Sequence, residues 1–176
     1  MTKDNPAIDN LVSRRTIRQF DGRPVEEEAL QTILKAAMAA PTAFDARPWH
    51  FVLVDDPAVM ATLSKRMGGC EMCEQTPNGI LVCADPSTEK LPGIWIQDCS
   101  ACVQNIQLAV HALGLATVWL AIYLVEERIQ AVREIMNIPS TLIPFALLPV
   151  GYPNELPDQR ERFLPERVHR NYMAEQ

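Results

Sequence analysis

Residues 40–54 read APTAFDARPWHFVLV, and this stretch decides how the chain enters its sheet. The last six, from Trp49 to Val54, form a largely apolar run with β-branched residues, which predicts a buried strand. The segment before them holds two prolines, an acid at Asp45 and a base at Arg47. A spacer needs only a few polar residues. Such a stiff, mixed-charge segment is therefore typical of a binding loop.

Helical and strand-like segments alternate along the rest of the chain, which predicts a sheet covered by helices. Helices are predicted over residues 6–13, 25–40, 57–67, 94–113 and 126–136, and strands over 49–54, 80–84, 116–121 and 145–150. The apolar stripe of the second helix is Leu30, Ile33, Leu34, Ala37 and Met38. The fourth helix is the longest and most apolar, so we expect it to be the central buried one.

The length and composition indicate one domain over residues 1–176, with 154–176 as a C-terminal arm. This arm is polar and has no autonomous fold, so it is either disordered or laid across a partner surface. The net charge of −6 argues against nonspecific nucleic-acid or anionic-membrane binding, so we expect neither partner. No run is long enough to span a bilayer, and the N-terminus has no apolar signal region, so we expect a cytoplasmic protein.

Arginine dominates the basic residues, at twelve of the sixteen. Two groups stand near the ends of the chain: Arg14, Arg15 and Arg18, and then Arg160 and Arg162. The planar guanidinium suits phosphate and carboxylate groups. Each arginine alone could be a solvated surface charge, but two clusters in an acidic chain favour a localised anion site.

The five cysteines permit two interpretations. The pairs Cys70/Cys73 and Cys99/Cys102 have the spacing of a zinc site. The second pair lies within a helical pattern, where cysteines at this spacing are commonly packing residues. No nucleotide-binding, nucleophile-elbow or metalloprotease motif occurs, and the three histidines are interpreted as structural. An enzyme with such a sequence would rely on a cofactor for its chemistry.

Four segments in order resemble the motifs of the nitroreductase-like flavoproteins. They are SRRTIRQF (13–20), APTAFDARPWHFVLV (40–54), DCSACVQNIQLAVHALGLATVWL (98–120) and PVGYPNELPDQRER (149–162). The resemblance implies an α+β fold with a central, mainly antiparallel sheet flanked by helices, and a homodimer with FMN at its interface. It implies that NADH or NADPH reduces the flavin at N5 in a ping-pong cycle, after which a nitroaromatic or quinone-like oxidant is reduced.

The same resemblance implies cofactor-binding roles for particular residues. Arg14 and Thr16, with Arg15, match positions at the phosphate and ribityl chain, and Arg18 matches a basic position near flavin N1 and O2. Arg160 and Arg162 match the closing basic pair at the phosphate. Further matches are Pro41, Thr42 and Ala43 along the ring edge, and Ala121 and Ile122, whose backbone N–H groups are expected at N5 and O4.

Asp45 and Arg47 depart from the family pattern, which has Asn and Gln there. Asp45 can accept from a ribityl hydroxyl or flavin N3–H, with Arg47 as its counter-ion, or the two can pair and face away. Two other functions stay open at this point. One is a flavin enzyme of different chemistry, such as reductive dehalogenation or flavin fragmentation. The other is a non-catalytic flavin- or zinc-binding module.

Overall fold

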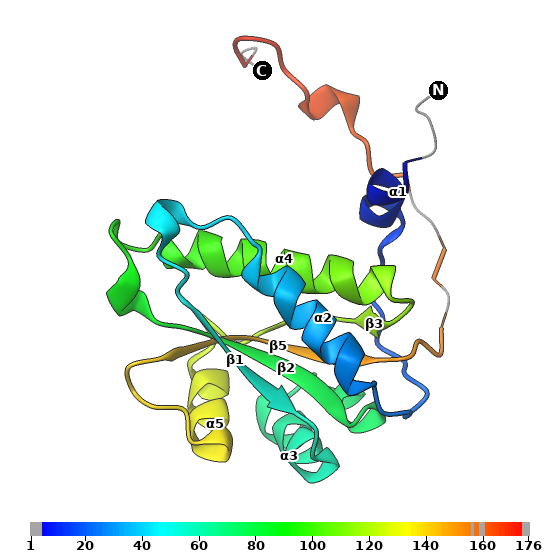
Figure 1. Cartoon of the computed structure of the whole chain (residues 1–176), viewed down its shortest axis with the longest axis vertical. Helices are drawn as coiled ribbons and strands as arrows, with labels where there is room; N and C mark the ends of the chain where they lie inside the picture. Colours follow the sequence, from blue (N-terminus) through cyan, green and yellow to red (C-terminus); the bar gives the residue numbers. More distant parts are fainter. Residues whose placement is uncertain (1–4, 156, 159–160, 174–176) are drawn as a thin grey trace.

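The structure is a computed structural model that describes residues 5–155, 157–158 and 161–173. Its centre is a five-stranded sheet in the order β1 (Trp49–Val54), β2 (Asn78–Ala84), β5 (Ile143–Gly151) and β3 (Ala116–Thr117), with β4 (Leu120–Ala121) also paired to β5. Every pairing is antiparallel. Helices α2 and α4 cover one face of the sheet, and α3 and α5 cover the other (Figure 1). The expected α+β fold is confirmed.

The helices begin and end close to where the sequence predicts. Helix α1 (Pro6–Ser13) is capped by the Asn5 side chain, and α3 (Pro57–Met67) by that of Asp56. Both caps accept hydrogen bonds from free N–H groups of the first turn. The other long helices are α2 (Glu27–Met38), α4 (Trp95–Ala112) and α5 (Glu126–Met136). Short 3-10 turns are η1 (Ala43–Asp45), η2 (Glu71–Gln75), η3 (Pro86–Thr88) and η4 (Pro165–Arg167).

The core lies on both sides of the sheet. Along β2, Ile80 and Val82 pack with α2 and α4, whereas Leu81 and Cys83 face the cluster under α3 and α5. All seven residues of β2 are buried, because neighbouring strands cover its edges and helices cover its two faces. In the described part of the chain, no helix is both long and apolar enough to cross a membrane.

Four predicted features are wrong in detail. The strand Trp49–Val54 is not fully buried, because β1 is an edge strand and His50 is exposed. Met38 is 55% exposed, because it lies about 100° around the helix from the fully buried Ala37. The predicted strand 116–121 divides into β3 and β4. Both β2 and β5 begin two residues earlier than expected.

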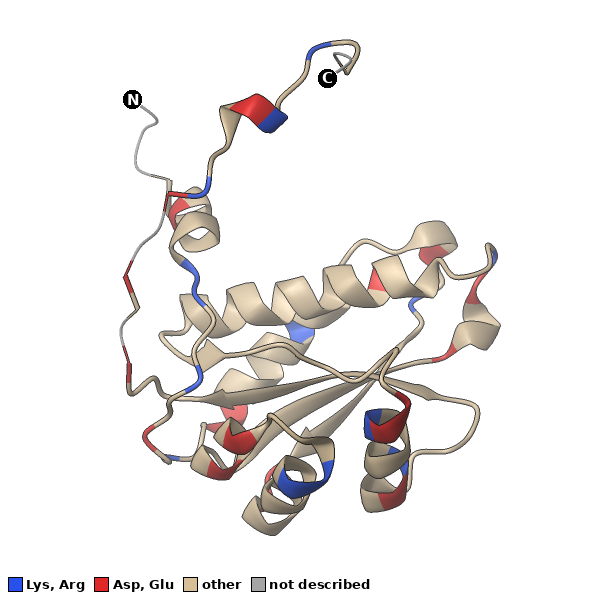
Figure 2. Ribbon diagram, turned by 180° about the vertical axis from the view of Figure 1, so that it is seen from behind, with Lys and Arg blue, Asp and Glu red and all other residues tan. Residues whose placement is uncertain are grey.

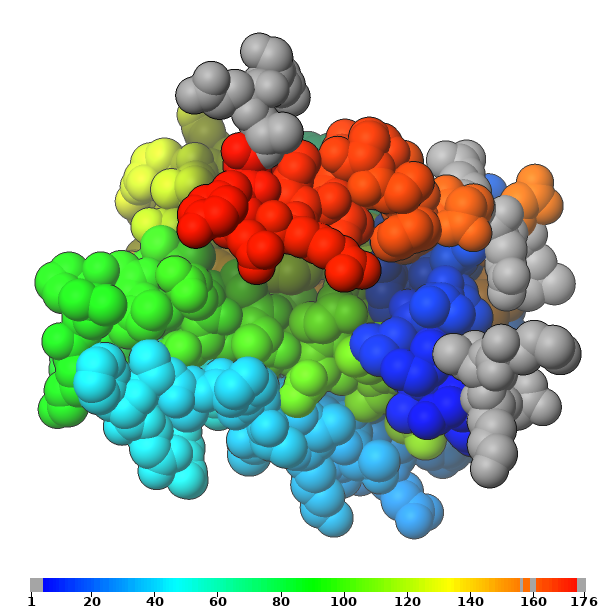
Figure 3. All heavy atoms as spheres, turned by 90° about the horizontal axis from the view of Figure 1, so that it is seen from above, coloured from blue at the N-terminus to red at the C-terminus, as the bar shows by residue number. Residues whose placement is uncertain are grey.

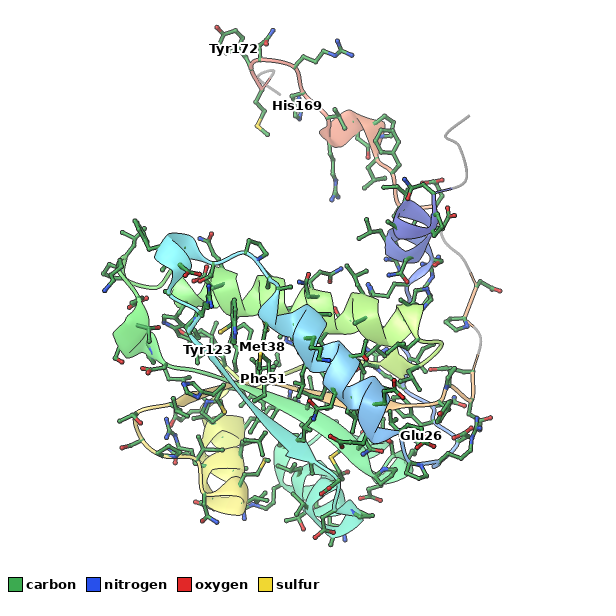
Figure 4. The ribbon with its side chains drawn as sticks, in the orientation of Figure 1. Glu26, Met38, Phe51, Tyr123, His169 and Tyr172 are labelled. Atoms are coloured by element: carbon green, nitrogen blue, oxygen red, sulfur yellow. The ribbon has the colours of Figure 1, made fainter. Side chains whose placement is uncertain are left out.

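Residues 161–173 form an arm that projects from the layered body. Figure 1 shows it rising past α1, and Figure 3 looks down onto it. Every described residue of this arm is exposed, including the large apolar side chains of Phe163, Leu164, Val168, Tyr172 and Met173. Tyr172 and His169 lie well clear of the sheet and its helices (Figure 4). Exposed apolar side chains in such number are typical of an interaction surface.

Candidate functional site

Two segments near opposite ends of the chain lie side by side. Phe20 forms a bridge with Pro153, and the N–H of Asn154 donates to the carbonyl of Gln19 at 2.8 Å. The carboxylate of Glu155 accepts from the N–H of Arg18 at 2.6 Å, across 137 residues of sequence. At Gly151 a Cβ atom would lie 3.0 Å from the Phe20 ring, so glycine permits this close approach. The two ends of the chain also bring the charge of Arg162 near that of Arg14.

A cavity of about 340 Å³ opens beside this junction. Its walls come from the end of α1 and the residues after it, the last turns of α4, β3, and the residues Pro153, Glu155 and Pro157. Figure 2 shows basic segments between α1 and the sheet. The polar and charged residues of the wall are Ser13, Arg14, Arg15, Gln107, His111, Thr117 and Glu155. We call this space the cationic cavity.

Arg14 is the most unusual residue of the cationic cavity. Its Nη1 atom is buried and has no hydrogen-bond partner among the described residues. Burial lowers the pKa of the Arg14 guanidinium, and the positive charges of Arg162 and Arg15 lower it further. Arginine stays protonated at physiological pH, and Arg14 forms no salt bridge within the described residues. A phosphate group in the cavity would supply the missing charge and acceptor atoms. These residues therefore fit the phosphate end of FMN.

The other predicted phosphate residues have different surroundings. Arg15 uses Nη1 to donate to the carbonyls of Val12, Ser13 and Arg14, and Nε to donate to that of Asp158. Arg15 therefore closes the end of α1 and ties down the segment before the arm. Thr16 is half-buried and Arg18 is exposed, and neither is among the described residues that line the cavity. Arg160 lies outside the described residues.

Five polar or charged members of the cationic cavity were not predicted from the sequence: Ser13, Gln107, His111, Thr117 and Glu155. Ser13 and His111 are 98 residues apart, yet the Ser13 hydroxyl and His111 Nε2 lie 2.8 Å from each other. Gln107 and Thr117 are buried in the wall. Gln107 and His111 are four residues apart on α4, so they share a helical face. The spacing of two polar residues on one helical face, just before the turn at Gly114, was the sequence signal that could have indicated this wall of the cavity.

The loop that begins at Pro41 is fixed by a buried carboxylate. Asp98, in the first turn of α4 and 6% exposed, accepts from the Thr42 hydroxyl at 2.9 Å and the Ala43 N–H at 3.0 Å. Pro41 is exposed, whereas Thr42 and Ala43 are half-buried. The predicted ring-edge segment is therefore held in one conformation by a residue that the sequence did not single out.

Asp45 and Arg47 form an ion pair with each other. Arg47 Nε lies 2.6 Å from Asp45 Oδ1, and Nη2 lies 2.9 Å from Oδ2. Both side chains are exposed. This arrangement is the second of the two alternatives above, in which Asp45 and Arg47 pair with each other and face away. Phe44, Asp45 and Arg47 all have positive φ angles, of 55°, 55° and 46°. Non-glycine residues rarely adopt this region, and such strain concentrates at functional sites.

Replacing Asp98 tests the anchor of this loop. Asp98→Ala should lower the free energy of unfolding by about 2 to 4 kcal/mol, because two donors lose a charged acceptor. Urea denaturation at fixed protein concentration measures the change. Gln97→Ala, an exposed neighbour, is the control and should change stability by less than about 0.5 kcal/mol. A loss below about 1 kcal/mol for Asp98→Ala would contradict the anchoring role.

The backbone N–H of Ile122, which was expected to face a ligand, is already used within the fold. The N–H of Ile122 donates to the carbonyl of Phe145 at 3.1 Å, and that of Tyr123 donates to the same oxygen at 3.0 Å. Ile122 is fully buried, so its N–H is not available to a ligand as expected. Leu124 is 82% exposed, has φ 72°, and its N–H bonds to no described residue. Ala121 is also exposed, and its carbonyl accepts from Arg128.

The cationic cavity and the Pro41 loop lie at opposite ends of α4. Asp98 is in the first turn of this helix and His111 in the last, so they are roughly 20 Å apart along the axis. Within one chain, therefore, the structure does not bring Pro41, Thr42, Ala43 and Asp45 together with Arg14.

The four cysteines of the zinc interpretation are separated by the sheet. Cys70 and Cys73 pack in the cluster under α3 and α5, and Cys99 and Cys102 pack with α2 and α4. All four are fully buried. Burial raises the pKa of Cys73 and of Cys99 to about 12, which keeps both thiols protonated. The zinc alternative is therefore excluded for these two pairs, because they cannot share one ion.

An antiparallel sheet between two helical layers, with a cationic cavity built from both chain ends, defines an α+β protein suited to an anionic ligand. The sequence model of the Nitroreductase family matches residues 11–91 and 86–152. The chain belongs to the nitroreductase family.

Three relatives illustrate the match. A protein of Methanothermobacter thermautotrophicus, provisionally described as an NADH dehydrogenase/NAD(P)H nitroreductase, is 43% identical over 92% of this chain and 85% of its own length. A crystal structure of a protein with the same provisional description, from Parabacteroides distasonis, has a TM-score of 0.92 and 32% identity, covering 97% of this chain and 100% of that one. An FMN-dependent nitroreductase of Clostridium difficile has a TM-score of 0.88 and 30% identity, covering 94% and 99%.

Proposed function

We propose that this chain is an FMN-dependent oxidoreductase that uses NADH or NADPH to reduce a small organic oxidant of the nitroaromatic or quinone class. The observation that carries the proposal is the buried, unpartnered Nη1 of Arg14 in a cavity that Arg15 also lines. Family membership and the description of a similar protein as an FMN-dependent nitroreductase support the choice of FMN.

In this proposal the phosphate of FMN lies against Arg14 and Arg162, with Arg160 as a further member of the clamp. Charge-assisted hydrogen bonds to guanidinium groups are strong and directional. Thr16 and Arg18 would stand along the ribityl chain and ring, as the family pattern implies. Nearer the ring, the N–H of the exposed residue Leu124 replaces that of Ile122 as the proposed backbone donor, together with that of Ala121.

We also propose that the protein is a homodimer in which the partner's loop completes the site. The loop from Pro41 to Asp45 is too far from the cavity of its own chain, so a second copy would supply it. Helix α4 supports this arrangement, because it carries one acid and no lysine or arginine over its 18 residues (Figure 2). The exposed apolar residues of the arm would pack on the same partner, in keeping with one domain over residues 1–176 and an arm over 154–176.

The flavin, when bound, would accept a hydride from the nicotinamide and pass reducing equivalents to the oxidant. The protein residues would bind and orient it. Arg14 and Arg162 would fix the phosphate, and Asp98 would hold the Thr42–Ala43 backbone in place. The five cysteines are free and buried, which is compatible with the reducing cytoplasm that we propose as its location.

The direct test is to purify the protein and measure bound flavin. We expect a yellow protein that releases about one FMN per chain on denaturation. Anaerobic addition of NADH or NADPH should bleach the flavin, and a nitroaromatic or quinone should restore its colour. A colourless protein that does not take up added FMN would overturn the proposal. Bound FMN that neither nicotinamide reduces would instead identify a flavin-binding module.

A further inference from the structure

The pair formed by Ser13 and His111 stands in the wall of the cationic cavity. The Ser13 hydroxyl oxygen and His111 Nε2 are 2.8 Å apart, and both residues line the cavity beside Arg14 and Arg15. A histidine hydrogen-bonded to a hydroxyl is commonly structural. Here, however, the pair lines the same cavity as Arg14, whose buried Nη1 lacks a partner among the described residues, at the proposed phosphate position.

We propose, resting on the FMN function above, that His111 and Ser13 belong to the phosphate subsite and that binding of a phosphate monoester protonates His111. The proton comes from solvent and goes to the imidazole. Neutral His111 can accept the Ser13 O–H at Nε2. Protonated His111 must donate its Nε2–H to Ser13 Oγ, which frees the serine hydroxyl hydrogen. The freed hydroxyl can then donate to a phosphate oxygen.

The charges around His111 favour this coupling. Before binding, burial lowers the pKa of His111, and the positive charges of Arg14 and Arg15 lower it further. The other charged group in the described wall is Glu155, whose carboxylate accepts from the N–H groups of Arg18 and Gln19. Arg162 acts on the site through its repulsion of Arg14. A dianionic phosphate would neutralise these cations and attract a proton to His111, so the pKa of His111 rises on binding.

The direction of the pH dependence follows from that rise. When the pKa of a group is higher in the complex than in the free protein, that group strengthens binding, and the full effect is present at a pH below the pKa of the free protein. That contribution is lost as the pH rises through its pKa in the complex. Each unit of rise strengthens binding at low pH about tenfold. The phosphate of FMN itself titrates near pH 6, but this effect is common to wild type and variants.

The experiment compares FMN with riboflavin, which lacks the phosphate. The chain has three histidines, so NMR of labelled histidine can follow each one, with His111→Gln assigning the His111 signal. We expect FMN to raise the pKa of His111 by about one to two units, and riboflavin to leave it unchanged. His50, exposed on β1, is an internal reference that should not respond.

Affinity measurements give a second, independent result. The dissociation constant of FMN should be larger for His111→Gln than for wild type. The ratio of the two dissociation constants should increase about tenfold as the pH falls from 7.5 to 5.5. His50→Gln, the matched control, should follow wild type. An unchanged pKa of His111 with FMN bound, or an equal rise with riboflavin, would overturn the inference. Failure of wild type to bind FMN at any pH would instead overturn the proposed function.

Discussion

The double variant Arg14→Ala with Arg162→Ala is expected to lose FMN while the protein stays folded and dimeric. Each arginine would contribute a charge-assisted hydrogen bond to the phosphate, worth about 1.5 to 3 kcal/mol. Losing both should raise the dissociation constant of FMN by about 10² to 10⁴. Fluorescence titration of apoprotein with FMN measures the change, and circular dichroism reports the fold.

A control with the same loss of charge is Lys65→Ala with Arg66→Ala. Both residues are exposed on α3, across the sheet from α4, so FMN binding should not change. Retention of FMN by the Arg14/Arg162 variant would reject the phosphate clamp.

The unpartnered Nη1 of Arg14 leads to a separate prediction about the stability of the apoprotein. Arg14→Met should make the apoprotein more stable, by about 1 kcal/mol, because an unsatisfied buried donor is removed.

Introducing charge into the arm is expected to separate the proposed dimer. Phe163 and Leu164 are 67% and 41% exposed in the single chain, and the proposal buries them against the partner. Two aspartates in place of large apolar anchors should each cost about 2 kcal/mol or more. Phe163→Asp with Leu164→Asp should therefore weaken dimerisation by about 10³ or more, which sedimentation can measure.

The matched control for the arm variant changes the net charge equally on a different surface. Thr62→Asp with Lys65→Ala alters exposed positions of α3 only, and should remain dimeric. If the arm variant also remains dimeric at the lowest concentration measured, the arm does not stabilise the dimer. The monomer should also lose FMN, because the partner's loop would be absent. By contrast, the Arg14/Arg162 variant should lose FMN as a dimer.

Local signals predicted most of the secondary structure, because caps and apolar periodicity act within a few residues. Asn5 and Asp56 show this well, since each caps the helix that the sequence placed after it. The strand predicted over 116–121 failed, because its division into β3 and β4 depends on pairing with β5, which is distant in sequence.

Site residues that belong to clusters of charge in the sequence were predictable. Site residues that come together from distant parts of the chain were not. Arg14 and Arg162 were found as parts of basic groups, and the structure places them close enough to repel each other. The pair of Ser13 and His111 joins residues 98 apart, which periodicity cannot reveal. The N–H of Ile122 was misjudged, because its acceptor on β5 depends on the strand register.

The joining of segments 17–21 and 152–155 has a consequence for how the protein opens. A ligand held by Arg14 and Arg162 would link the two ends of the chain, much as a covalent cross-link closes a loop. Closing so long a loop removes much of the freedom of the opened ends. In native-state hydrogen exchange, the amides of Phe20 and Asn154 should thus gain protection together when FMN binds. The bound cofactor would then stabilise the pairing of the two chain ends in addition to its role in the reaction.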